Sequence, residues 1–223
     1  MIAQGDIVGV CFVYLYVAVL LSVTEKVLSK RFPVGSRKFL HIMTGNIAFI
    51  LPLFQTREMM VFVAAGPFIL FTFLMSPYSP IKSLRGKTSE AGHGLGLVYY
   101  AITWTVSAYV FFDHRVIIAI GILAMSYGDG LASLFGKKYG KRTYQIFRDT
   151  KSYVGSFAMF VFTFLCLVIA MVFYAVPLSF SGLMILAWIS LCAAFVEGIT
   201  PLGLDNISVP FVVAVLFYFF MVV

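Results

Sequence analysis

The stretch GDGLASLFGKKYGKRTYQIFRDTKSYVGS, residues 128–156, decides how this chain is organised. It places one acidic residue, Asp129, inside an apolar segment, continues as a basic loop with several glycines, and ends in a polar turn that opens the next apolar segment. A carboxylate at membrane depth is costly and usually marks a functional site. The acid and the cationic loop together predict a metal and nucleotide site at a membrane surface.

The composition is that of an integral membrane protein. Of the 223 residues, 61% are hydrophobic and 11% are charged. In a soluble domain about 45–50% of the residues are apolar and about 25% are charged. The apolar runs approach the roughly 20 residues that a helix needs to cross a bilayer. We therefore expect an all-α, polytopic transmembrane helix bundle that forms a single domain over residues 1–223.

The apolar runs predict eight membrane spans. Their expected bounds are 6–28, 37–54, 58–76, 93–112, 115–135, 153–175, 181–199 and 207–223. The last run is short and has Pro210 near its start, where proline is tolerated in a first helical turn. Seven spans with a re-entrant seventh segment are the alternative.

The charges predict the orientation. All of the 16 Lys and Arg except Arg57 and Arg115 fall in or beside the connections after the first, third and fifth spans. The positive-inside rule then places this basic face in the cytoplasm and both termini outside. The basic charge follows the topology, so we expect no nucleic-acid partner, and the sequence leaves a homo-oligomer open.

The fifth span carries a polar stripe beside a stripe of small residues. Asp129, Ser133 and Lys137 are spaced i, i+4, i+8 and share one helix face. The small stripe, which would let another helix approach closely, comprises Gly128, Ala132, Gly136 and Gly140. A structural ion pair at Asp129 is the alternative to a functional acid.

The start of the sixth span suits a phosphate group. Lys151 supplies positive charge, and Ser152 and Gly155 belong to a helix start, where backbone N–H groups can bind phosphate. The alternative is that the basic loop serves only as a topology signal or contacts anionic lipid.

Carboxylates recur around the seventh connection. Glu197 ends an apolar span, and Asp205 and Asn206 precede the next. Oxygen ligands of this kind suit Mg²⁺, which often also binds phosphate oxygens. The alternative for Asp205 and Asn206 is a helix N-cap.

Two further groups lie on the same expected face. Arg37 and His41 share one stripe at the start of the second span and could bind phosphate or move a proton, with Lys38 beside them. A snorkelling Arg and an interfacial His are the alternative. Glu90 and Gly94 could form a wall of the substrate region.

In these segments the chain resembles the CTP-dependent polyprenol kinase family, which includes phytol, farnesol and dolichol kinases, and it is most similar to the phytol kinase branch. Four motifs carry the resemblance, which covers nearly the whole chain after residue 24: RKFLHIMTG (37–45), GDGLASLFGKKYG (128–140), KSYVGS (151–156) and EGITPLGLDNISVP (197–210). The resemblance implies transfer of the terminal phosphoryl group of CTP to a membrane-embedded isoprenoid alcohol of phytol, geranylgeraniol, farnesol or dolichol type, with Mg²⁺ or another divalent cation.

These observations assign roles within one expected cytoplasmic site. We expect Asp129, Glu197 and Asp205 to bind the metal with help from Asn206, and His41 or one of the carboxylates to orient or deprotonate the alcohol. The residues expected to hold phosphate or nucleotide are Arg37, Lys38, Ser133, Lys137, Lys151, Ser152 and Gly155.

Other functions remain open at this point. A CTP-dependent lipid cytidylyltransferase would release pyrophosphate in place of CDP, and a CTP-dependent diacylglycerol kinase would use a different alcohol. A transporter is the alternative outside enzymes, but the polar residues gather at one face and do not run through the bilayer.

Overall fold

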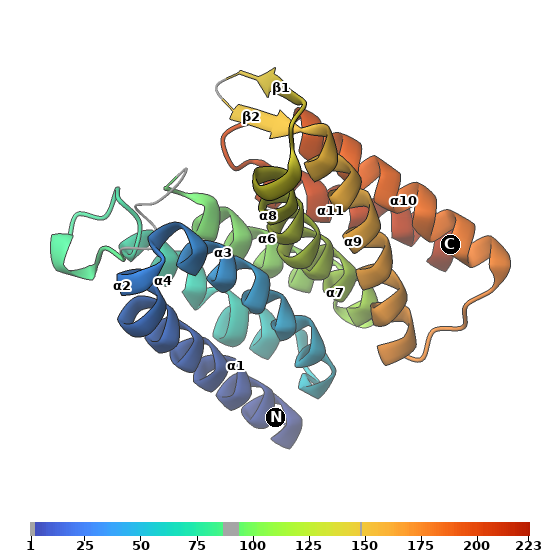
Figure 1. Cartoon of the computed structure of the whole chain (residues 1–223). Helices are drawn as coiled ribbons and strands as arrows, with labels where there is room; N and C mark the ends of the chain where they lie inside the picture. Colours follow the sequence, from blue (N-terminus) through green and yellow to red (C-terminus); the bar gives the residue numbers. More distant parts are fainter. Residues whose placement is uncertain (1–2, 87–93, 148) are drawn as a thin grey trace. The chain divides into compact units, whose positions relative to one another are not determined.

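The computed structural model describes residues 3–86, 94–147 and 149–223, and it is predominantly helical (Figure 1). In this part of the chain, five helices are long and apolar enough to cross a membrane: Gln4–Leu28, Phe112–Tyr139, Tyr153–Phe173, Phe180–Ile199 and Asp205–Val222. A shorter apolar helix covers Met59–Leu74. The helical membrane class is confirmed, while the count of eight spans and the side that faces the cytoplasm stay predictions.

The chain divides into two compact units, Met1–Arg115 and Val116–Val223, and the expectation of a single domain stays a prediction. Unit 1 begins with α1 (Gln4–Val23), η1 (Thr24–Leu28), α2 (Ser29–Arg31) and α3 (Pro33–Thr44). It continues through η2 (Gly45–Phe49), η3 (Leu51–Leu53), η4 (Met59–Ala65), α4 (Pro67–Leu74), η5 (Lys82–Leu84), α6 (Gly96–Val110) and η6 (Phe112–His114).

A buried carboxylate ties the start of unit 1 together. Asp6 of α1 is fully buried, and its Oδ1 accepts hydrogen bonds from the backbone N–H groups of Gln55 and Thr56 at 2.8 and 3.0 Å. The Thr56 hydroxyl donates to Oδ2 at 3.0 Å. A buried charge needs such partners, so Asp6 has a structural role in fixing the segment between η3 and η4 beside α1.

Unit 2 is built from a long broken helix, a hairpin and three further helices. The first helix runs through α7 (Arg115–Leu123), π-helical η7 (Ala124–Asp129) and α8 (Gly130–Tyr139). The strands β1 (Thr143–Ile146) and β2 (Asp149–Ser152) follow, and then α9 (Tyr153–Phe173), α10 (Phe180–Ile199), α11 (Asp205–Phe217) and η8 (Tyr218–Val222). Helix α9 packs between α8 and α10, and α11 packs against α10 and η7.

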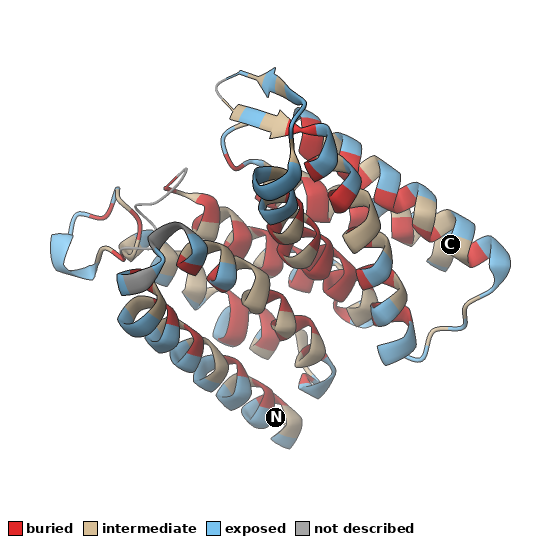
Figure 2. Ribbon diagram, in the orientation of Figure 1, coloured by how far each residue is buried: buried red, intermediate tan, exposed pale blue. Residues whose placement is uncertain are grey.

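Burial differs sharply between the helices (Figure 2). All residues from Ile117 to Ser126 are buried, so α7 and the start of η7 are interior segments. Helices α1 and α10 instead expose large apolar side chains, among them Phe12, Leu15, Trp188 and Phe195. Such surfaces are costly in water but are expected where helices face lipid.

The small-residue stripe of α8 packs against α9, as the sequence predicted. A Cβ added to Gly128 would lie 2.4 Å from Thr163 Oγ1, and one added to Gly136 would lie 2.8 Å from Ser152 Oγ and 3.3 Å from Gly155 Cα. Both glycines therefore permit a helix approach that a larger residue would prevent.

Two expectations about the unit 2 connections were wrong. Strands β1 and β2 pair antiparallel, with Tyr144 opposite Lys151, where a basic loop was expected. Helix α11 begins at Asp205, so Pro210 lies inside the helix and not in its first turn. Proline there removes a backbone hydrogen bond, and Gly121 lies close beside it, since an added Cβ would be 3.1 Å from the Pro210 carbonyl oxygen.

Replacing Gly128 should destabilise unit 2. In Gly128→Ala the new methyl group overlaps Thr163, and forced overpacking typically costs about 1–3 kcal/mol. We expect a lower unfolding temperature in detergent. Gly35→Ala in α3 is the matched control, because its nearest contact would be 3.5 Å from Phe32 Cβ. Equal unfolding temperatures for the two variants would contradict the close packing of α8 on α9.

Candidate functional site

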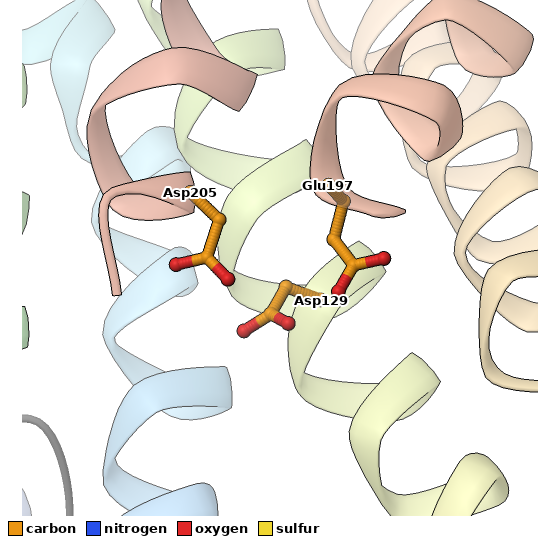
Figure 3. Close-up of side chains that lie close together, drawn as sticks. All are labelled: Asp129, Glu197 and Asp205. Atoms are coloured by element: carbon orange, nitrogen blue, oxygen red, sulfur yellow. The ribbon is translucent and has the colours of Figure 1, made fainter. Parts of the chain in front are cut away.

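Three carboxylates converge at one end of unit 2 (Figure 3). Asp129 ends η7, Glu197 lies in the last turn of α10, and Asp205 is the first residue of α11. One oxygen from each lies within 4.8 Å of those of the other two. Glu197 is buried, and Asp129 and Asp205 are half-buried. The sequence prediction that these three acids share a site is consistent with this geometry.

Lys151 supplies the positive charge of this acidic cluster. Its Nζ lies 2.7 Å from Glu197 Oε1 and 3.8 Å from Asp205 Oδ2, and it also donates to the Glu197 carbonyl oxygen. Burial by itself would lower the pKa of Lys151, but the negative charges of Glu197, Asp205 and Asp129 raise it above the ordinary value of 10.5. The side chain is therefore an ammonium ion held among three carboxylates.

The helix ends explain why a cation is needed here. A carboxylate is favoured near a helix N-terminus, where Asp205 lies, but disfavoured near a helix C-terminus, where Glu197 lies. Lys151 compensates by contacting both the Glu197 carboxylate and a terminal carbonyl oxygen of α10. Lys151 thus offsets part of the negative charge of the three carboxylates.

The hairpin places Lys151 through two further contacts. Asp149 of β2 accepts a hydrogen bond from the Leu202 backbone N–H at 2.6 Å, in the loop between α10 and α11. The Tyr144 hydroxyl, on the strand paired with Lys151, hydrogen-bonds Ser156 Oγ at 2.7 Å. It also lies so close to Gly198 that an added Cβ there would be 2.9 Å away. Sequence reasoning missed Tyr144, Asp149 and Ser156, because their importance comes from a strand pairing that a four-residue alternation signals only weakly.

Asn206 positions Asp205. Its Nδ2 donates to the Gly203 carbonyl at 2.9 Å and lies 3.3 Å from Asp205 Oδ1, which also accepts from the Asn206 backbone N–H at 3.0 Å. The N-cap residue of α11 is Leu204, which makes no side-chain capping hydrogen bond. Asp205 and Asn206 therefore do not form the helix N-cap that was the alternative interpretation. A direct metal contact by Asn206 stays a prediction.

The donor set of the cluster fits a hard divalent cation. It consists of carboxylate oxygens from three helices, which Mg²⁺ and similar ions prefer. Few protein ligands would suffice, because Mg²⁺ usually keeps several waters and shares phosphate oxygens with its substrate.

The other predicted residues of unit 2 differ in exposure and in their contacts. Ser133 is half-buried and Lys137 is exposed on α8. Ser152 caps α9, where its Oγ accepts from the Gly155 N–H at 3.1 Å. That N–H is thus already used in the structure, and the predicted phosphate contacts of these residues stay predictions.

The remaining predicted residues belong to unit 1. Arg37, Lys38 and His41 are half-buried on α3, and the His41 ring packs edge-on against Tyr100 with centroids 6.2 Å apart. Gly94 is buried with φ +70°, and a Cβ there would lie 2.9 Å from the Tyr78 ring, which gives it a structural reason to be glycine. Glu90 lies outside the described residues.

Comparison with known proteins identifies the family. The chain is 31% identical over 207 residues to the phytol kinase of Synechocystis sp., covering 91% of this chain and 86% of that protein. This chain belongs to the polyprenol kinase family. It is also 32% identical over 193 residues to phytol kinase 1 of Arabidopsis thaliana, covering 78% of this chain and 62% of that protein.

A more distant member of the polyprenol kinase family matches part of the chain. A dolichol kinase of Schizosaccharomyces pombe is 33% identical over 99 residues, 44% of this chain and 18% of that protein. No protein-family model and no solved structure matches.

Removing the cluster's ammonium should destabilise unit 2. In Lys151→Met three buried or half-buried carboxylates lose their cation, and breaking a buried ion pair costs about 3–5 kcal/mol. We expect a lower unfolding temperature that millimolar Mg²⁺ partly restores, since the ion can replace the lost charge. Lys137→Met, at an exposed position of α8, should show neither effect. A Lys151→Met protein as stable as the wild type without Mg²⁺ would contradict the cluster.

The stability difference between wild type and Lys151→Met should also depend on pH. The folded state raises the pKa of Lys151, so its stabilising contribution is fully present below about 10.5 and is lost as pH rises through the higher folded value. Unfolding measured between pH 7 and 11 should show a constant difference up to about pH 10 and a smaller one above it. A difference that disappears below pH 9 would contradict the ion pair.

Proposed function

We propose that this protein phosphorylates a membrane-embedded isoprenoid alcohol of phytol, geranylgeraniol, farnesol or dolichol type, with CTP as donor and Mg²⁺ or another divalent cation as cofactor. The observation that carries the proposal is the cluster of Asp129, Glu197 and Asp205 around Lys151, in a chain whose relatives are named phytol and dolichol kinases. Phosphoryl transfer needs positioning and charge neutralisation more than covalent chemistry from the protein, and this cluster offers both.

Exposed cations in unit 2 support an anionic, water-soluble donor. Four basic residues in the last turn of α8 and just after it are exposed: Lys137, Lys138, Lys141 and Arg142. Charges of one sign around a site raise the local concentration of an oppositely charged substrate. We therefore assign them to attracting the triphosphate, from the expected cytoplasmic side.

Asp129, Glu197 and Asp205 would hold the divalent ion. When bound, the ion neutralises charge on the phosphate oxygens that it shares with the protein. Lys151, which contacts Glu197 in this structure, would then be available to bind a phosphate oxygen of the nucleotide. The lysine then stabilises the charge that builds up on the oxygens during transfer.

The proposed reaction transfers one phosphoryl group from CTP directly to the alcohol. The alcohol oxygen attacks the terminal phosphorus of CTP, a new oxygen–phosphorus bond forms, and the bond to the β-phosphate oxygen breaks to release CDP. The alcohol proton passes to an acceptor within hydrogen-bond reach. The candidates for that acceptor are Glu197, one of the other cluster carboxylates, and His41 of unit 1.

An assay of the purified protein tests the function directly. With labelled CTP and Mg²⁺, we expect CDP and a lipid monophosphate from phytol, geranylgeraniol, farnesol or dolichol, and little product from diacylglycerol. Release of pyrophosphate with a CDP-lipid product would establish the cytidylyltransferase alternative, and preference for diacylglycerol would establish the other kinase. Absence of any nucleotide turnover with the whole panel would contradict the proposal.

Asp129→Asn should abolish transfer and leave a folded protein. The amide keeps the size of the side chain but removes one of three charges that hold the cation, so we expect kcat to fall by at least about 100-fold. Asp113→Asn is the matched control, because Asp113 is an exposed acid paired with Arg57 at 2.8 Å. Activity of Asp129→Asn within twofold of that control would contradict the metal role.

A further inference from the structure

An apolar pocket lies wholly within unit 1, whereas all residues of the acidic cluster belong to unit 2. Helices α1, α3, α4 and α6 together with η2 line it, and the cavity, which opens partly to the surface, has a volume of about 50 Å³. Its aromatic walls come from Phe68, Phe71, Tyr100 and Trp104. Of these helices, α1 belongs to a helix long and apolar enough to cross a membrane, and α4 to the shorter apolar helix Met59–Leu74.

The two threonine hydroxyl groups in the lining of this pocket already donate hydrogen bonds to backbone carbonyl groups. The Thr44 hydroxyl donates to the Leu40 carbonyl at 2.6 Å, and the Thr72 hydroxyl donates to the Phe68 carbonyl at 2.6 Å. Both bonds lie within their own helices, so these threonines present methyl groups more readily than polar atoms. A pocket with such walls favours a hydrocarbon ligand over water or a polar molecule.

The pocket extends along α6. Leu97, Tyr100, Ala101 and Trp104 all line it and cover about two helical turns, or roughly 10 Å. Tyr100 packs against His41, which is itself half-buried, whereas Trp104 is 2% exposed and packs against Phe68 with centroids 6.0 Å apart. The pocket thus adjoins a polar imidazole through the Tyr100 ring, and near Trp104 it is bounded by aromatic rings.

Buried Trp104 also carries an unused donor. Its indole Nε1 makes no hydrogen bond to any described residue, although a buried indole N–H usually finds a partner. The π-electrons of a carbon–carbon double bond are a weak acceptor for such a group, as the faces of aromatic rings are. A saturated acyl chain offers no such acceptor.

We propose that this pocket holds part of the hydrocarbon chain of the isoprenoid alcohol substrate. The inference rests on the proposed function, which requires the protein to bind such an alcohol. Apolar and aromatic walls, with the His41 imidazole beside Tyr100, suit an alcohol whose chain enters the pocket while its polar end stays outside.

A photoreactive farnesol analogue tests this assignment. The probe carries a diazirine on its terminal isoprene unit and is added to the full-length protein in detergent with phospholipid. We expect saturable labelling of peptides from α4 and α6 that excess geranylgeraniol suppresses at least tenfold and excess stearyl alcohol, whose chain is saturated, suppresses less than threefold. Labelling spread over the exposed face of α1, or equal suppression by both alcohols, would overturn the proposal.

A pocket-filling substitution supplies the second measurement. Ala101 is 2% exposed and lines the pocket, so Ala101→Phe should reduce labelling at least fivefold and raise the KM for the alcohol by a similar factor, with the KM for CTP unchanged. Val110→Phe, at an exposed position on the same helix, is the control. If Ala101→Phe does not fold, the labelling of the wild-type protein and its suppression by the competing alcohols still test whether the pocket binds the substrate.

The two measurements separate the pocket from the function. Normal phosphorylation of phytol with labelling outside α4 and α6 would contradict the pocket and leave the function standing. Saturable labelling of the pocket in a protein that phosphorylates none of the alcohols would support the pocket and contradict the function.

Discussion

The contact between Lys151 and the carboxylates of Asp129, Glu197 and Asp205 is the constraint on which unit 2 depends. Like charges brought this close repel one another, and the low polarity of their surroundings strengthens the repulsion. The Lys151 ammonium offsets part of it. The carboxylate oxygens of the cluster are at the same time the ligands that a divalent cation with its phosphate ligand prefers.

The rest of unit 2 can be understood as the support for this contact. The π-helical turn of η7 ends on Asp129, and such turns often occur at functional sites. The glycines of α8 bring α9 close, and α9 follows directly on the strand that carries Lys151. The hairpin is fastened to the α10–α11 loop through Asp149 and Leu202. Four segments distant in sequence thereby converge on one charge.

Much of the membrane architecture could be predicted from the sequence, because apolar runs and small-residue spacing are local signals. Five long apolar helices and the α8–α9 packing follow from them. The three acids could be selected because each is conspicuous beside apolar residues. The hairpin could not, since a four-residue strand has little periodicity and its partner contacts lie across the fold. Lys151 was expected to hold phosphate, but its present partners could be seen only once β2 and the end of α10 were placed together.

Electron paramagnetic resonance of bound Mn²⁺, used in place of Mg²⁺, tests the central claim most directly. Titration of the purified wild-type protein in the presence of CTP should show one saturable site per chain, and Asp205→Asn and Glu197→Gln should each weaken the affinity for Mn²⁺ at least tenfold. Wild-type affinity in both variants would contradict the account, because the carboxylates around Lys151 would then not bind the metal.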